Sequence, residues 1–108
     1  MLASQSPAAG APAILYACPP GKIAVVSINV CNRSSNLARI SLGLRNGADA
    51  IAPGDWIEFS TPIAAAGSGA GAVMERTGLV LRGGDRLWAF TDLAGVNFHV
   101  WGLLEDDA

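Results

Sequence analysis

Short runs in which hydrophobic and polar residues alternate follow one another along most of this chain. The clearest run covers residues 23–32, where every second residue is a small or branched hydrophobic one. A period of two places such residues on one face of a β-strand. Three runs predict an inward face in this way: Ala24, Val26, Ile28 and Val30; Ala38, Ile40, Leu42 and Leu44; and Val96, Phe98 and Val100.

Turn-forming residues separate the runs. Pro19, Pro20 and Gly21 form a strong turn signal, because proline fixes φ and glycine accepts a positive φ. The polar segment 33–36 joins two alternating runs, which predicts that residues 23–32 and 37–45 form a hairpin. Residues 62–72 carry no charge and predict a flexible loop. Further strands are expected at residues 14–18, 55–59, 77–81 and 86–91.

About seven or eight short strands, without a helix-length run of period 3.6, predict an all-β fold. We expect one antiparallel β-sandwich domain, jelly-roll-like, at residues 13–104. Residues 1–12 are rich in alanine, proline and glycine and predict a flexible N-terminal arm. This arm either stays disordered or lies along a neighbouring subunit. Residues 105–108 are expected to form a short acidic tail.

The composition adds expectations about partners. Hydrophobic residues make up 51 % of the chain and charged residues 15 %, with a formal net charge of −2. The charged share is well below the usual quarter or so, which indicates that some apolar surface lies against a partner. Without a basic stripe, nucleic-acid binding is not expected. The start of the chain does not resemble a secretory signal and no apolar stretch is long enough to span a bilayer, so we expect neither export nor membrane association, and synthesis in a cytoplasm.

The residues offer little for catalysis. His99 is the single histidine, and zinc sites need about four Cys, His or carboxylate ligands. Cys18 and Cys31 share no ligand spacing with it, and no pair of carboxylates stands out. The glycine-rich segments 67–71 and 83–85 lack the lysine and hydroxyl residue of a phosphate-binding loop. We therefore expect no cofactor, no metal and no enzymatic activity.

The two cysteines are expected to remain free. If residues 14–18 and 23–32 formed a hairpin, Cys18 would lie beside the turn and Cys31 about nine residues beyond it, roughly 30 Å away. A disulfide needs Cα atoms within about 7 Å. Buried free thiols are the expectation, and a bond between subunits is the alternative.

Aromatic residues predict an interaction surface. Trp88 and Trp101 both fall opposite the face assigned to the core, which indicates an apolar outer surface that a partner covers. The residues predicted for this interface are Trp88, Trp101, Tyr16 and His99.

Several segments of the chain carry a family resemblance: Ile14-Leu15-Tyr16, Pro20-Gly21-Lys22, Ala24-Val25-Val26-Ser27, Val30-Cys31-Asn32-Arg33-Ser34, Gly78-Leu79-Val80-Leu81 with Gly83 and Asp85, and Ala94-Gly95-Val96-Asn97-Phe98. Together they resemble small β-sandwich proteins and modules of tailed-bacteriophage virions. The resemblance covers roughly residues 14–104, and its motifs are turns and core strands that carry no catalytic residues.

This resemblance implies a structural component of a virion. The expected function is that of an accessory protein of the capsid, neck or tail, for instance a capsid decoration. It would contact copies of itself, in a trimer or ring, and other capsid or tail proteins. The alternative is a glycan-binding or host-surface-binding module of a tail fibre, because exposed aromatic rings also suit sugar stacking.

Overall fold

The computed structural model describes residues 2–47, 50–68 and 72–107. They form eight strands and one 3-10 turn, and none of them belongs to a helix long and apolar enough to cross a membrane. The elements are β1 (Ala3–Gln5), β2 (Ala13–Ala17), β3 (Lys22–Asn32), β4 (Ala38–Asn46), η1 (Pro53–Asp55), β5 (Trp56–Ile63), β6 (Val73–Arg82), β7 (Asp85–Thr91) and β8 (Val96–Asp106).

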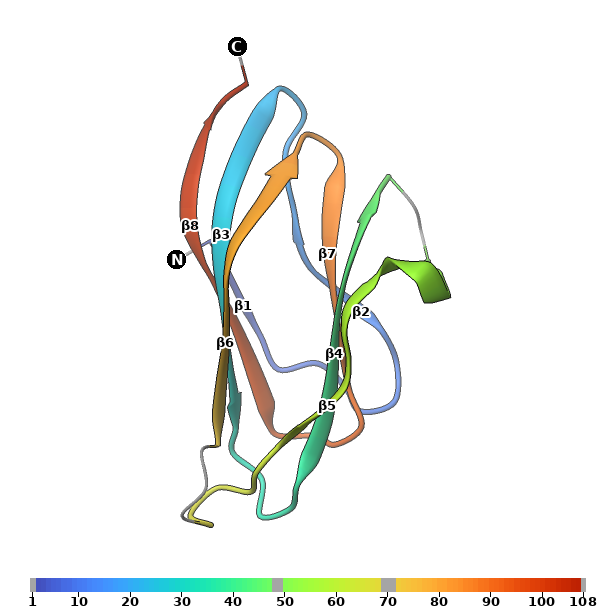
Figure 1. Cartoon of the computed structure of the whole chain (residues 1–108), viewed down its shortest axis with the longest axis vertical. Helices are drawn as coiled ribbons and strands as arrows, with labels where there is room; N and C mark the ends of the chain where they lie inside the picture. The colour runs from blue at the N-terminus through green and yellow to red at the C-terminus, as the bar shows by residue number, and fades with distance from the viewer. Residues whose placement is uncertain (1, 48–49, 69–71, 108) are drawn as a thin grey trace.

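Two four-stranded antiparallel sheets pack face to face (Figure 1). Sheet A has the strand order β1-β8-β3-β6, and sheet B has the order β2-β7-β4-β5. The pairs β1·β8, β2·β7, β3·β6 and β4·β5 are therefore nested one inside another along the chain. This nesting is the winding of a jelly roll, so the predicted all-β sandwich is confirmed.

The core lies between the sheets and follows the predicted alternation. The inward residues of β3, β4 and β8 pack together, while their neighbours along each strand face outward or lie at the sheet surface. Most inward strand positions remove a branched or aromatic side chain from water, which is the main stabilising term of the fold. The largest fully buried side chains include Phe98, Ile28, Ile40, Leu42, Leu81 and Leu87.

The predicted hairpin between residues 23–32 and 37–45 is wrong. β3 belongs to sheet A and β4 to sheet B, so the segment between them crosses from one sheet to the other. β2 and β3, the other pair considered as a hairpin, also lie in different sheets. Alternation specifies which face of a strand is buried, but it does not specify the partner strand.

Buried Asn32 holds the β3–β4 crossover in place. Its side-chain nitrogen donates to the carbonyl oxygens of Asn36 at 2.9 Å, Ile63 at 3.1 Å and Ala64 at 3.2 Å. Its side-chain oxygen accepts hydrogen bonds from the backbone N–H and the hydroxyl of Ser34 at 2.9 and 2.7 Å. Because a buried amide must be hydrogen-bonded, this residue fixes the path of the crossover.

The N-terminal segment contains a strand that the sequence did not predict. Ala3–Gln5 pairs with β8, and the backbone N–H of Leu2 donates to the carbonyl of Val100 at 2.7 Å. Backbone hydrogen bonds suffice to add a short edge strand, so no hydrophobic pattern in the sequence indicates β1. The acidic end differs as well, because Glu105 and Asp106 extend β8 against β3. Part of the predicted loop, residues 69–71, lies outside the described residues.

Candidate functional site

Trp101 and His99 lie on the outer face of sheet A, as the alternation in β8 predicts. Trp101 is 50 % exposed and is followed two positions later by Leu103, which is 67 % exposed. Val25 of β3 pairs with Leu103 on one side and with Val80 of β6 on the other. These four exposed residues, Trp101, Leu103, Val25 and Val80, form what we call the sheet A patch.

His99 lies on the same face at its polar end. It pairs with Ser4 of β1 and Asn29 of β3, and it lines a hollow of about 300 Å³ with Ser4, Gln5, Ser6 and Asn97. Among the described residues, no group of three or more His, Cys, Asp or Glu side chains is arranged to hold a metal ion. The histidine therefore belongs to a polar surface region beside the apolar patch.

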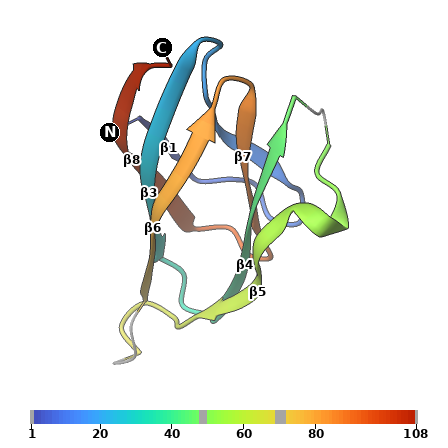
Figure 2. The same cartoon turned by 45° about the horizontal axis from the view of Figure 1, so that its top comes forward.

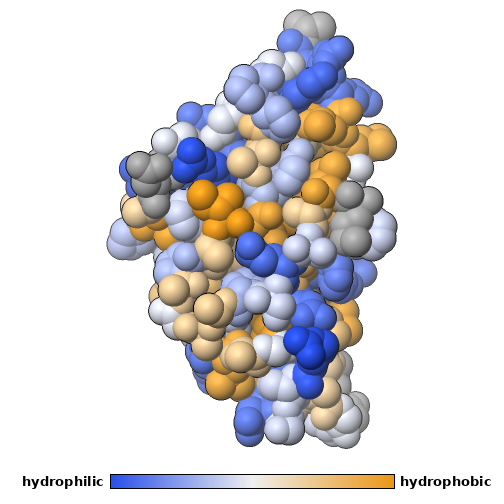
Figure 3. Space-filling model, turned by 180° about the vertical axis from the view of Figure 1, so that it is seen from behind, coloured by the Kyte–Doolittle hydropathy of each residue, from blue (hydrophilic) through white to orange (hydrophobic). Residues whose placement is uncertain are grey.

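The C-terminal half of β8 is also a sheet edge that the described residues leave uncovered. The carbonyl of Val100 points toward β1, and the backbone groups of alternate strand residues point to the same side. The backbone N–H and C=O groups of Gly102 and Leu104 consequently point away from β3. No described residue pairs with β8 beyond Val100 on this side. Viewed from behind, hydrophobic residues gather at the upper right, on the side where the end of β8 runs (Figure 3).

The prediction that Trp88 is exposed is wrong. Trp88 does face outward from sheet B, but it is only 6 % exposed. The β4–β5 connection covers this area, as Ile51 and Trp56 lie over Gly43, the residue beside Trp88 in the sheet. Figure 2 shows this connection, with η1, on the side of sheet B away from sheet A. The chain itself thus covers a surface that we had assigned to a partner.

Tyr16 lies apart from the other predicted interface residues. It is half-buried in β2 and packs against the core of the sandwich. Burial raises the pKa of its hydroxyl, and nearby Cys18 adds to this effect. The structure brings Trp101 and His99 together on one face but does not bring Trp88 or Tyr16 to it.

An aromatic groove lies on the outer face of sheet B. It has a volume of about 280 Å³ and is lined by Pro12, Arg39, Ser41, Trp56, Phe59, Ser60, Phe90 and Asp92. A second hollow of about 380 Å³ is lined by Pro53 and again by Trp56 and Phe59. The rings of Trp56 and Phe59 lie 6.1 Å apart at an angle of 54°, so they form a ridge between the two hollows.

A β-bulge produces this ridge. Ile40 pairs with Thr61 and Leu42 with Glu58, so β5 has one residue more than β4 in this interval. Ser60 has a φ of 54°, the only positive φ at a described residue other than glycine. Its backbone N–H donates to the Ser41 hydroxyl at 3.0 Å, which helps to hold this conformation. The bulge turns Phe59 outward, where it is 71 % exposed.

Polar groups line one wall of the groove. The Arg39 side chain donates to the Ser60 carbonyl at 3.3 Å, and the Arg39 backbone N–H donates to one carboxylate oxygen of Asp92 at 2.8 Å. No described residue hydrogen-bonds to the other carboxylate oxygen of Asp92, to the Ser60 hydroxyl or to the remaining Arg39 nitrogens. The groove therefore combines exposed rings with free donors and a free acceptor.

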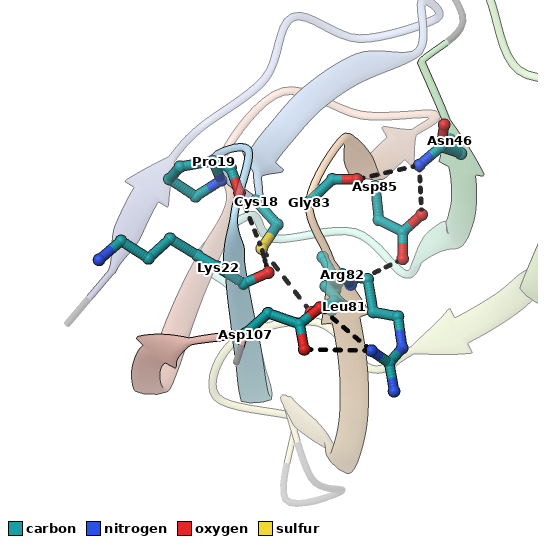
Figure 4. A network of polar contacts seen from close by, with 9 residues as sticks. All are labelled: Cys18, Pro19, Lys22, Asn46, Leu81, Arg82, Gly83, Asp85 and Asp107. Carbon is teal, nitrogen blue, oxygen red and sulfur yellow. Dashed lines mark hydrogen bonds and ion pairs between the residues drawn. The ribbon is translucent and has the colours of Figure 1, made fainter.

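Cys18 belongs to a polar network at the end of the sandwich where the β2–β3 and β6–β7 turns meet (Figure 4). Its thiol lies near the carbonyls of Lys22, Leu81 and Pro19 at 3.6 to 3.8 Å. Burial raises the pKa of this thiol, and the carboxylates of Asp85 and Asp107 add to the rise. Cys18 and Cys31 form no disulfide with each other, as expected, but only Cys18 is buried and Cys31 is half-buried. A bond between subunits stays an alternative.

The sequence did not predict the groove, because bulges are not visible in a hydrophobic pattern. Ser60 stands between Phe59 and Thr61, and a serine at this position gives no signal of an extra residue. The groove and the sheet A patch are the two surface regions whose geometry suggests binding. No protein-family model, curated protein or solved structure matches this chain.

Proposed function

We propose that this chain is an accessory structural protein of a tailed-phage particle, a capsid decoration, neck or tail component, that acts through protein–protein contacts. The observation that carries the proposal is the coincidence of the sheet A patch with the free edge of β8. The resemblance of residues 14–104 to virion β-sandwich modules supplies the link to the particle. Jelly rolls serve both as capsid and as lectin domains, so the fold alone favours neither role.

Side chains and backbone of β8 both suit a contact with a neighbouring subunit. Trp101, Leu103 and Leu104 expose hydrophobic surface within four consecutive residues. The outward N–H and C=O groups of Gly102 and Leu104 can accept another strand, the usual risk of an uncovered edge. A soluble monomer normally blunts such an edge, so its retention here supports use in assembly.

The proposed neighbours are further copies of this chain and other capsid or tail proteins. An antiparallel pairing of two β8 edges closes as a twofold dimer. A trimer or ring instead requires that the sheet A patch contact a different surface of the next copy. Charge at the end of β8 limits which partners fit, because Glu105, Asp106 and Asp107 are acidic. Lys22 pairs with Asp106 and Arg82 with Asp107, which reduces this charge locally.

Sedimentation of the isolated protein and of particles tests the proposal. We expect the wild-type chain to self-associate or to co-sediment with particles, and Leu103→Lys to weaken either association at least tenfold. Val73→Lys is the matched control, since Val73 of β6 is also an exposed residue of sheet A but lies beside the other end of β3. A monomeric wild-type chain that leaves the particles unbound, or equal loss in both variants, would contradict the proposal.

A further inference from the structure

We infer that the aromatic groove of sheet B binds a neutral carbohydrate, with one sugar ring stacked on Phe59 beside Trp56. This site is on the opposite face of the sandwich from the sheet A patch. The inference does not depend on the proposed role in a particle, and either can fail without the other.

The exposure of the Phe59 ring is the first argument for a binding site. A phenylalanine that is 71 % exposed contributes little to the core, and the neighbouring backbone at Ser60 adopts the left-handed conformation that side chains disfavour. Backbone strain of this kind persists where the surrounding structure enforces it and is concentrated at binding sites. Core packing does not require the exposed ring. Its position between two hollows leaves a ring face open to a flat ligand.

The polar wall is the second argument. A sugar ring has an apolar face of C–H groups and a rim of hydroxyls, each of which donates and accepts hydrogen bonds. Beside the rings, the free nitrogens of Arg39 and the Ser60 hydroxyl can donate, and the free oxygen of Asp92 can accept. This arrangement complements the two kinds of surface on one sugar residue.

Charge and size exclude other ligand classes. Arg39 and Asp92 carry opposite charges, so the groove has no excess charge for a phosphate, and nucleic acid needs several cations along one path. An extended peptide that adds to a sheet needs a free edge, whereas this groove lies on a sheet face. Volumes of about 280 and 380 Å³ are at the small end of ligand pockets, which fits one or two sugar residues.

Titration of the full chain with neutral sugars, followed by NMR, tests the inference. The probes are glucose, galactose, mannose, N-acetylglucosamine, maltotetraose and cellotetraose. We expect at least one to shift the indole N–H signal of Trp56 and the amide signals of Ser60 and Asp92 in a saturable way. Signals of Trp101 and Leu103, on sheet A, should not move.

Matched variants locate the site. Phe59→Ala should weaken binding about fivefold or more, because it removes the stacking surface. Asp92→Asn should weaken it less, because it replaces one acceptor by an NH2 donor and leaves the stacking surface intact. Leu103→Ala, which shortens an equally exposed side chain on sheet A, should bind as the wild type does. A thermal melt of each variant separates loss of binding from loss of folding, since Phe59 is too exposed to carry much stability.

Four results would overturn the inference. They are the absence of saturable shifts with every probe, unchanged affinity in a folded Phe59→Ala variant, shifts confined to sheet A, and binding of a proline-rich peptide in the groove when no sugar binds.

Discussion

The guanidinium of Arg76 lies 2.6 Å from the carboxylate of Glu58, and this ion pair joins β6 of sheet A to β5 of sheet B. Arg76 also donates to the Ile57 carbonyl at 3.4 Å, and the hydroxyl of Thr61 donates to the other carboxylate oxygen of Glu58 at 2.9 Å. Both strands are sheet edges, so the contact links the two sheets along the side of the sandwich formed by β5 and β6.

Arg76→Ala should lower the free energy of unfolding by about 1 kcal/mol, since the pair is partly exposed and water screens it. Urea unfolding measures the difference. Arg33→Ala is the control, because Arg33 donates to Asn97 within sheet A and joins no second sheet. If both variants unfold at the same urea concentration, the ion pair between the sheets contributes no more stability than the Arg33 hydrogen bond.

Gly102 permits close contact between β8 and β3. A Cβ atom at this position would lie 2.1 Å from the carbonyl oxygen of Val25, and φ at Gly102 is +155°. Gly102→Ala should therefore force the two strands apart and destabilise the protein by about 1–3 kcal/mol, the usual effect of overpacking. Gly54→Ala is the control, since its Cβ would meet nothing within 4 Å. Thermal unfolding that is unchanged in Gly102→Ala would contradict this geometry.

The two thiols should differ in reactivity. Cys18 is 2 % exposed, and its raised pKa keeps the thiol protonated at neutral pH, whereas Cys31 is half-buried on the outer face of sheet A. Ellman's reagent should modify Cys31 first, and Cys18 only as the protein unfolds. Cys31→Ser should remove the fast phase and Cys18→Ser the slow one. A single fast phase of two thiols in the folded protein would contradict the prediction.

The same thiol makes stability depend on pH. A thiol in the unfolded chain loses its proton above a pKa of about 8.5, while the folded chain holds the proton of Cys18 to higher pH. The stabilising contribution is complete below the unfolded value and declines as the pH rises from there through the folded pKa. Chemical unfolding between pH 7 and 10 should show this decline in the wild type, and a smaller one in Cys18→Ala.

Deletion of residues 1–10 should leave the sandwich folded but less stable. β1 supplies one edge of sheet A, and Leu2 and Ala3 pack against the core, so the deletion exposes the first half of β8. We expect a loss of about 1–2 kcal/mol in a urea titration, from backbone hydrogen bonds and packed side chains. Deletion of residues 105–108, which removes the end of β8 and the ion pairs of Asp106 and Asp107 but leaves β1 in place, is the comparison. An unchanged midpoint after the N-terminal deletion would show that β1 adds no stability.

The sequence predicts the faces of the strands well and their partners poorly. Val26, Ile28 and Val30 are inward because a period of two leaves no other way to bury them. The pairing of β3 with β6 and β8 instead depends on contacts between residues far apart in the chain, and on Asn32, whose buried amide bends the chain into the other sheet. In the sequence alone, a buried asparagine cannot be distinguished from an ordinary turn residue, because its hydrogen-bond partners are unknown.

The candidate sites show the same difference between features that alternation decides and features that depend on distant contacts. Trp101 lies on the predicted face because only alternation decides its direction. The burial of Trp88 depends on Gly43, whose missing side chain leaves room for Ile51 and Trp56 to cover that face. The groove depends on extra residues in β5, and the hydrophobic pattern alone does not reveal which residues of a strand are unpaired.

The nested strand pairs also determine the order in which the pairs can form during folding. β4 and β5 are joined by a short connection, so their pairing needs the smallest loss of chain entropy. Each pair that forms shortens the loop for the next, from β3·β6 and β2·β7 out to β1·β8. Folding should accordingly be slow for a chain of this length, because most pairings are distant in sequence. β1 is the last strand to dock and the first to leave, and its amide protons should exchange with solvent before those of any other strand.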